Sequence, residues 1–187
     1  YPDKLSVVMG DALKINPNEI LEGGYKIVAN LPYNIATPLL IKWLSQSPIH
    51  WDSLTLMFQK EVAQRICAEP GDDAYGRLAV LSNWLADTTI EFDVSADVFV
   101  PPPKVTSAIV TLVPREQPLA EADLSILEKI TAAAFGQRRK MLRASLKQIT
   151  PEAESILLAC NIDPTRRAET LTIEEFCALA RALKEYL

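Results

Sequence analysis

The segment Lys26-Ile27-Val28-Ala29-Asn30-Leu31-Pro32-Tyr33 carries the strongest fold signal in the sequence. It starts as a short, mainly apolar run and ends in turn formers, a pattern typical of a buried parallel strand. Ser6-Val7-Val8-Met9, which Gly10 closes, has the same pattern. We therefore expect parallel strands at residues 6–9 and 26–29.

A helix should follow, and strands and helices then alternate along the chain. Thr37 is a good N-cap and Pro38 suits a first helical position, so we expect this helix to begin there and to end at Ser45. The same kind of reading predicts strands at 53–59, 89–94 and 107–113 and helices at 61–68 and 77–86. The rigid segment Val100-Pro101-Pro102-Pro103-Lys104 separates the last two strands. Alternation that ends in a strand pair predicts an α/β sheet with an antiparallel edge.

The pattern changes after Pro114. A polar linker at 115–122 leads into helical periods only, which predict helices near 123–135, 138–148, 151–160 and 172–186. We therefore divide the chain into an α/β part at 1–114, the linker, and a small all-helical domain at 123–187.

Composition excludes several classes of protein. No apolar run in the 187 residues approaches the roughly 18 needed to cross a bilayer, so a membrane protein is not expected. Three widely spaced cysteines predict neither a disulfide framework nor a zinc site, and a reducing cytoplasm fits best. The chain opens without an initiator Met or a signal peptide, so we expect its true N-terminus to be missing. We expect a monomer.

The net charge of −5 hides a local basic excess. Residues 129–151 contain six basic residues and no acidic one. If 137–147 is one helix, Arg139, Arg143 and Lys147 form a single stripe, whose mutual repulsion phosphates would relieve. The alternative is a solvated basic face.

The tetrapeptide Asn30-Leu31-Pro32-Tyr33 follows its strand at the point where open α/β sheets place ligands. The exocyclic amine of adenine is a poor nucleophile because its lone pair is delocalised into the ring. The Asn30 side-chain oxygen and the Leu31 carbonyl can each accept one N–H, which favours a pyramidal nitrogen. Pro32 fixes the backbone, and Tyr33 offers a face on which a flipped base can stack. The alternative is an ordinary Asn-x-Pro turn.

Five runs in order carry a family resemblance. They are Val28 to Pro38, Gln59-Lys60-Glu61-Val62, Tyr75-Gly76-Arg77-Leu78, Phe99 to Val105, and Phe135-Gly136-Gln137-Arg138-Arg139-Lys140. Over nearly the whole chain, their order and spacing closely resemble the small-subunit ribosomal RNA adenine N6,N6-dimethyltransferases. The Arg138 to Lys140 cluster and the triple proline favour this branch over relatives that act on large-subunit rRNA or serve as mitochondrial transcription factors.

The resemblance implies a Rossmann-like S-adenosylmethionine-dependent methyltransferase domain followed by a helical domain. It also implies dimethylation of two adjacent adenosines near the 3′ end of small-subunit rRNA, with the small ribosomal subunit as partner. Asp11 would bind the adenine amine of the cofactor, Asn30 would lie between cofactor and substrate, and Phe99 would close on the target base opposite Tyr33. Asp11 as a turn cap and Phe99 as plain packing are the alternatives.

The resemblance also implies that Arg138, Arg139 and Lys140 contact the ribosome, and the basic pattern adds Arg143 and Lys147 as RNA-binding candidates.

One departure from the family pattern concerns the cofactor. The chain has six glycines but no Gly-x-Gly, the turn that admits the methionine moiety. We therefore expect this chain alone to be inactive, and a non-catalytic rRNA-binding or ribosome-assembly module is the competing interpretation.

Overall fold

Four strands form one mixed sheet in the computed structural model, which describes residues 4–185. They are β1 (Tyr25–Asn30), β2 (Trp51–Gln59), β3 (Ala86–Val94) and β4 (Ser107–Pro114), in the order β1-β2-β4-β3. β1 and β2 are parallel, whereas β4 is antiparallel to both of its neighbours. The predicted strand pair is therefore confirmed, but the antiparallel strand lies inside the sheet rather than at its edge.

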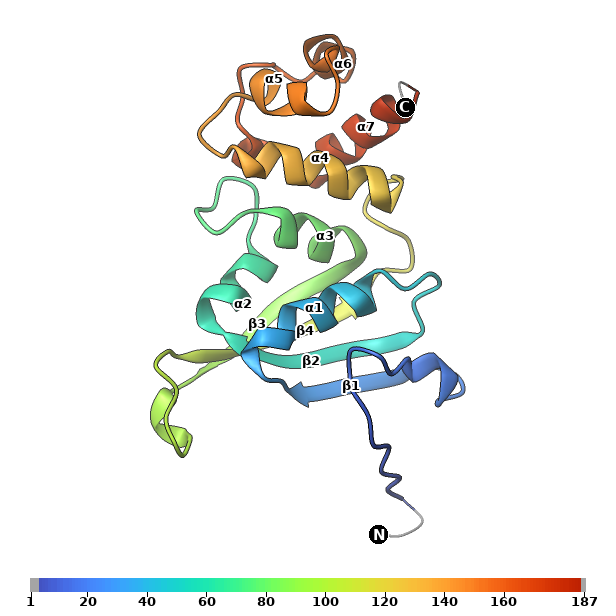
Figure 1. Cartoon of the computed structure of the whole chain (residues 1–187), viewed down its shortest axis with the longest axis vertical. Helices are drawn as coiled ribbons and strands as arrows, with labels where there is room; N and C mark the ends of the chain where they lie inside the picture. The colour runs from blue at the N-terminus through green and yellow to red at the C-terminus, as the bar shows by residue number, and fades with distance from the viewer. Residues whose placement is uncertain (1–3, 186–187) are drawn as a thin grey trace.

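Three helices cover one face of the sheet: α1 (Tyr33–Leu44), α2 (Lys60–Cys67) and α3 (Arg77–Leu85) (Figure 1). Alternation along β2 explains this arrangement, because Leu54, Leu56 and Phe58 point to the helices and are at most 1% exposed. On the other face, Val28 of β1 is 78% exposed. The sheet therefore has one closed face and one face that is open at β1.

The predicted strand at residues 6–9 is wrong. This segment has no regular structure, and Val7 and Met9 are 77% and 89% exposed. An apolar run forms a strand only when a neighbouring backbone satisfies its hydrogen bonds, and these residues pair with no strand in the described part of the chain. The chain becomes regular only at a short 3-10 helix, Pro17–Glu19.

The start of α1 also differs from the prediction. The helix begins at Tyr33 with Pro32 as its N-cap, and the amides of Ile35 and Ala36 donate to the Pro32 carbonyl. Pro38 lies inside the helix on its exposed side, where the carbonyl that loses a partner remains accessible to water. The predicted end at Ser45 is confirmed.

Beyond Pro114 the described residues form helices and loops. The α-helices are α4 (Leu124–Gly136), α5 (Leu142–Ser145), α6 (Ala153–Ala159) and α7 (Ile173–Lys184), and short 3-10 helices lie at Leu146–Gln148 and Ala168–Thr170. One further 3-10 helix, Ala96–Val98, lies earlier, between β3 and β4. Residue 186 of the predicted last helix lies outside the described residues. No helix between residues 4 and 185 is long and apolar enough to cross a membrane.

The predicted basic helix at 138–148 is confirmed only from residue 142 onward, where α5 and the 3-10 helix Leu146–Gln148 follow one another directly, and its first part is wrong. Gln137 to Lys140 form a turn after α4, and Met141, with an extended backbone, precedes the four-residue α5. Leu142 and Leu146, which follow the break, are buried in the core. Arg139, Arg143 and Lys147 therefore do not share one helical stripe.

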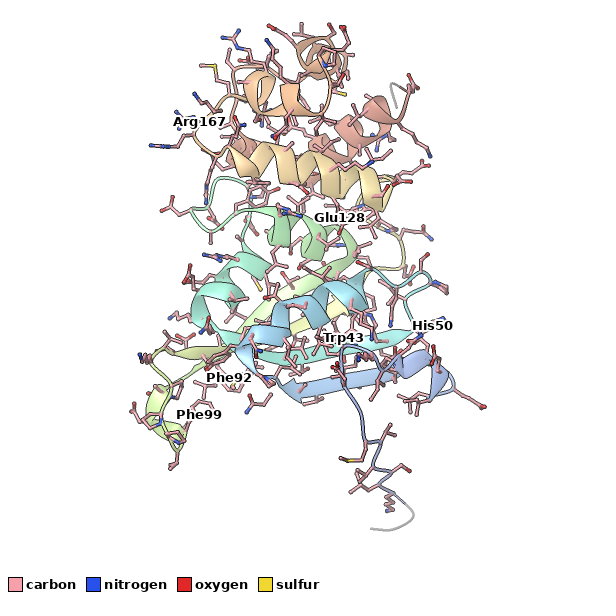
Figure 2. All side chains as sticks on the ribbon, in the orientation of Figure 1. Trp43, His50, Phe92, Phe99, Glu128 and Arg167 are labelled. Carbon is pink, nitrogen blue, oxygen red and sulfur yellow. The ribbon has the colours of Figure 1, made fainter. Side chains whose placement is uncertain are left out.

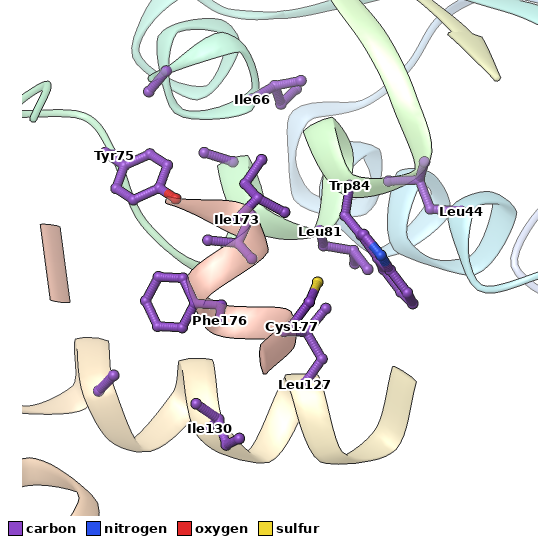
Figure 3. Packing of buried hydrophobic residues seen from close by; sticks show 14 of the residues in the cluster. Leu44, Ile66, Tyr75, Leu81, Trp84, Leu127, Ile130, Ile173, Phe176 and Cys177 are labelled. Atoms are coloured by element: carbon purple, nitrogen blue, oxygen red, sulfur yellow. The ribbon is translucent and has the colours of Figure 1, made fainter. Parts of the chain in front are cut away.

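A continuous buried cluster joins the sheet, its helices and the C-terminal helices. Tyr75, in the loop before α3, packs edge-on against Phe135 of α4 with ring centroids 5.8 Å apart. Phe135 in turn contacts Phe176 of α7 at 5.6 Å. Figure 3 shows Tyr75 and Phe176 in this cluster, together with Leu127 and Ile130 of α4. This packing couples the helical part to the part that carries the sheet.

Candidate functional site

The structure brings the predicted tetrapeptide and Phe99 together around one open cavity of about 360 Å³. Its lining consists of two groups, the turn after β1 and the segment before β4, with one residue of β2 between them: Asn30, Leu31, Pro32, Tyr33, Met57, Phe99, Pro101 and Pro103. A cavity with one flat aromatic side chain from each group can hold a planar ring.

The ends of two parallel strands position the polar part of the cavity. Asn30 is the last residue of β1, and its partner in the sheet is Met57 of β2. Asn30 is exposed and Leu31 is half-buried. Since the chain turns at Pro32 into α1, the Asn30 amide lies at the carboxyl edge of the sheet, where a ligand can reach it.

Tyr33 is the first residue of α1, and its hydroxyl lies 2.7 Å from the hydroxyl oxygen of Ser107. Ser107 is the first residue of β4 and is fully buried. The sequence patterns did not identify Ser107 or Met57 as site residues. Their places depend on strand register, and no local pattern in the sequence specifies which ends of distant strands meet.

Phe99 lies on an arm formed by residues 95–106, which extends beyond the sheet between β3 and β4 (Figure 2). Lys60 anchors the base of this arm from α2. Its amide donates to the Thr106 carbonyl at 2.9 Å, and its ammonium group contacts the Asp93 carboxylate at 2.5 Å. Phe99 itself is half-buried, whereas Phe92 of β3 is 60% exposed.

Asp11, the predicted cofactor residue, lies outside the lining of this cavity. Its carboxylate accepts the Leu13 amide at 3.0 Å and so caps a local turn, while the side chain remains exposed. Lys42 of α1 holds the same turn by donating to the carbonyls of Leu13 at 2.9 Å and Ile15 at 2.5 Å. The hydrogen bond to Leu13 uses one oxygen of the Asp11 carboxylate, and the side chain stays accessible to a ligand. The cofactor role of Asp11 therefore stays a prediction.

The predicted basic residues lie apart from the cavity. Arg138 donates to the Asp73 carbonyl at 2.6 Å, and Arg143 lies 3.9 Å from the carboxylate of Glu154. Arg138 also lines a hollow of about 450 Å³ together with Arg65 and Arg77, two arginines that were not among the RNA-binding residues predicted from the sequence. Arg65 is paired with the Glu61 carboxylate, so Arg77 and Arg138 are the main source of positive charge at this hollow.

A family model described as ribosomal RNA adenine dimethylase matches residues 2–185. The chain is 52% identical to a ribosomal RNA small subunit methyltransferase A of Ruegeria sp., over 99% of this chain and 67% of the relative. It is 55% identical to the Rhodopseudomonas palustris (strain TIE-1) protein of that name, over 98% and 64%. A third such protein, from Allorhizobium ampelinum, is 57% identical over 98% and 66%. The chain thus spans between 64% and 67% of the length of these three relatives.

Two solved structures share the fold. A dimethyladenosine transferase from Plasmodium falciparum matches with a TM-score of 0.79 and 26% identity, over 98% of this chain and 74% of that one. The 23S rRNA methyltransferase ErmE matches with a TM-score of 0.65 and 26% identity, over 95% and 71%. The α/β fold is therefore that of Rossmann-like methyltransferases, as expected from the sequence.

Proposed function

Since this chain belongs to the ribosomal RNA adenine dimethylase family, we propose that the complete protein dimethylates adenine N6 in small-subunit rRNA with S-adenosylmethionine as the methyl donor. Its targets are two adjacent adenosines near the 3′ end of that RNA, and each receives two methyl groups. The observation that carries this proposal is the shared cavity of Asn30, Leu31, Tyr33 and Phe99.

Asn30 and Leu31 act on the amine of the target base. The Asn30 side-chain oxygen and the Leu31 carbonyl each accept one N–H, which draws the nitrogen lone pair out of conjugation and directs it away from the ring. No protein base is needed, because the methylated amine can release its proton to water. Tyr33 and Phe99 hold the ring between them, and such stacking contributes about 1–3 kcal/mol per base.

The residues present fit part of a cofactor site. Asn30 lies at the carboxyl edge of two parallel strands, and the exposed carboxylate of Asp11 can accept a hydrogen bond from the amine of an adenine ring. When bound, S-adenosylmethionine supplies an electrophilic methyl group. The chain contains no Gly-x-Gly, so residues 1–187 by themselves provide mainly the acceptor half of the site.

The RNA partner contacts a basic surface that comprises Arg138, Arg139, Lys140, Arg143 and Lys147. Arg65 and Arg77 extend it around the hollow that they share with Arg138. Guanidinium and ammonium groups of this kind bind phosphates without reading sequence, so this surface orients the rRNA while the cavity selects the base. The protein acts as a monomer on the small ribosomal subunit in the cytoplasm. The division into an α/β domain at 1–114 and a helical domain from 123 onward assigns these two tasks to different parts of the chain.

A non-catalytic role in rRNA binding is the second candidate, because the chain lacks the glycine-rich turn. Calorimetric titration of residues 1–187 with S-adenosylmethionine shows whether this chain binds the methyl donor, as a complete enzyme would, or does not, as a non-catalytic rRNA-binding module would not. We expect no saturable binding in the micromolar range, and such binding would contradict the view that half of the cofactor site is absent.

Replacing Asn30 by Ala in the complete protein tests the proposed function. Loss of an acceptor that acts mainly in the transition state should lower kcat by about 100- to 1,000-fold. The affinity for unmethylated small subunits, measured by filter binding, should change little because the basic surface is intact. Unchanged turnover would refute the assigned role of Asn30.

A further inference from the structure

The hydroxyls of Tyr33 and Ser107 form a hydrogen bond between residues 74 positions apart in the chain. Their oxygens are 2.7 Å apart, and Ser107 is fully buried. A buried hydroxyl without a partner is costly, so this contact satisfies Ser107 and at the same time ties down the tip of the Tyr33 side chain. Ser82 on α3 provides a contrast, because its hydroxyl is also buried but has no partner among the described residues.

Ser107 occupies the point where the two walls of the cavity meet the sheet. It pairs with Gln59 of β2 on one side and with Val94 of β3 on the other. It is also the first residue after the arm that carries Phe99. A residue of a central strand that is paired on both sides has a rigid support, so the Ser107 hydroxyl has a well-defined position.

Tyr33 is consequently held at both ends. Its backbone begins α1, directly after Pro32, and its hydroxyl bonds to β4. A tyrosine side chain has two main torsions, and fixing both ends removes the freedom of the ring to turn away from the cavity. The face that meets a base is thereby set before the base arrives, which reduces the entropy cost of binding it in a reactive orientation.

We propose that Ser107 is a positioning residue for the methyl transfer, which acts through Tyr33 by fixing the ring on which the target adenine stacks. This inference rests on the proposed function of the cavity. Ser107 touches neither substrate nor cofactor, and its influence passes through one hydrogen bond.

A double-mutant cycle in the complete protein tests the inference. Ser107→Ala, Tyr33→Phe and the double variant each remove the same hydrogen bond. Each should lower kcat for unmethylated small subunits by about 3- to 10-fold. Because the bond can be lost only once, the double variant should be no slower than the slower single variant. Multiplying effects would overturn the proposal.

Two matched variants control for loss of a hydroxyl as such. Ser82→Ala removes a buried serine hydroxyl from α3, and Tyr25→Phe removes a tyrosine hydroxyl that donates to Asn18 at 2.6 Å at the far end of β1. Both should keep wild-type kcat. A Ser107→Ala variant that matches Ser82→Ala in kcat would show that Ser107 is only structural.

A spectroscopic readout separates positioning from stability. A short rRNA hairpin with 2-aminopurine at a target position reports stacking, because stacking quenches its fluorescence. The wild type should quench it on binding, and Ser107→Ala should quench it less while its melting temperature stays within about 2 °C of Ser82→Ala. Equal quenching would contradict the proposal. An inactive wild type would instead refute the proposed function.

Discussion

Phe99 lies on the arm and Phe92 lies nearby on β3, and the difference in position gives the two rings different roles. Both are exposed to some degree, but only Phe99 lines the cavity. Replacing Phe99 by Ala in the complete protein removes one of the two aromatic faces available to the base. We expect the KM for unmethylated small subunits to rise or kcat to fall such that kcat/KM drops by about 5- to 150-fold.

Phe92→Ala is the matched control for Phe99→Ala. It deletes an aromatic ring of the same size from β3, at a side chain that is 60% exposed. Steady-state methylation kinetics should show kcat/KM within about two-fold of the wild type. Equal losses for the two variants would mean that Phe99 acts only through the general surface of this region.

The N-terminus of α7 is an element whose stability depends on pH. Thr172 and Glu175 form a capping box, and Arg166 makes two hydrogen bonds to the Glu175 carboxylate, at 2.5 and 3.0 Å. Burial opposes the charged form of Glu175, but the Arg166 hydrogen bond, the Thr172 amide and the Arg166 charge together outweigh it and hold its pKa below the usual value. Because the folded-state pKa is depressed, this stabilisation is present above about pH 4.3 and is lost as pH falls through the folded-state pKa.

Glu175→Gln should therefore lower the free energy of unfolding by about 1–2 kcal/mol at pH 7. The difference from the wild type should shrink between pH 7 and a pH below the folded-state pKa, where the wild-type carboxyl is also protonated. Urea unfolding at both pH values measures it. Glu174→Gln, at the exposed neighbouring position, should have little effect at either pH, and a pH-independent loss in Glu175→Gln would contradict the linkage.

The turn at 137–140 is a second element whose role can be tested, here in RNA binding. If it contacts phosphates, Arg139→Ala and Lys140→Ala should each weaken rRNA binding and flatten the plot of log affinity against log salt by about one unit of slope. Lys184→Ala, at the end of α7, should leave that slope unchanged. Identical slopes for all three variants would remove the turn from the RNA surface.

Helices and strands were predictable from the sequence where a local pattern specifies them, and not where a distant partner does. β2 and β4 were predictable because burial on one face produces a period of two, and the Thr172 cap of α7 is visible locally. The prediction of a strand at 6–9 was wrong, because a strand forms only beside a neighbouring strand, and the apolar pattern does not reveal whether one is present. The first part of the basic helix failed because the amides of Leu142 and Arg143 donate to the carbonyls of Arg166 and Pro164, distant partners that helical periodicity does not reveal.

At the scale of the whole molecule, Tyr75 joins the sheet-bearing part to the helices. Its ring is fully buried against Phe135, and its hydroxyl is buried without a partner among the described residues. Burial, followed by the charges of Glu174 and Glu175, raises the pKa of this hydroxyl well above its ordinary value, so it stays neutral. Tyr75→Ala should therefore destabilise the protein by about 3–5 kcal/mol.

Tyr75→Phe should be neutral or slightly stabilising, since it keeps the ring and removes an unsatisfied polar atom. Chemical denaturation followed by circular dichroism measures both variants. A large loss in Tyr75→Phe would show that the hydroxyl has a partner in solution.

The site itself was predictable in part. The residues of the tetrapeptide and Phe99 could be named from motif order, since each motif is local. Met57, Ser107 and Arg65 could not, because they join the cavity or the hollow only through strand register and helix packing. Arg77 lies in a named motif, but the sequence did not show that it meets Arg138 at one hollow.

Mass spectrometry of small-subunit rRNA, after incubation with S-adenosylmethionine and the complete protein or its Asn30→Ala variant, tests the proposed methyl transfer most directly. We expect N6,N6-dimethyladenosine at two adjacent positions near the 3′ end with the wild type, and almost none with Asn30→Ala under the same conditions. Wild-type RNA without these two dimethylated adenosines, or equal dimethylation by the variant, would contradict it.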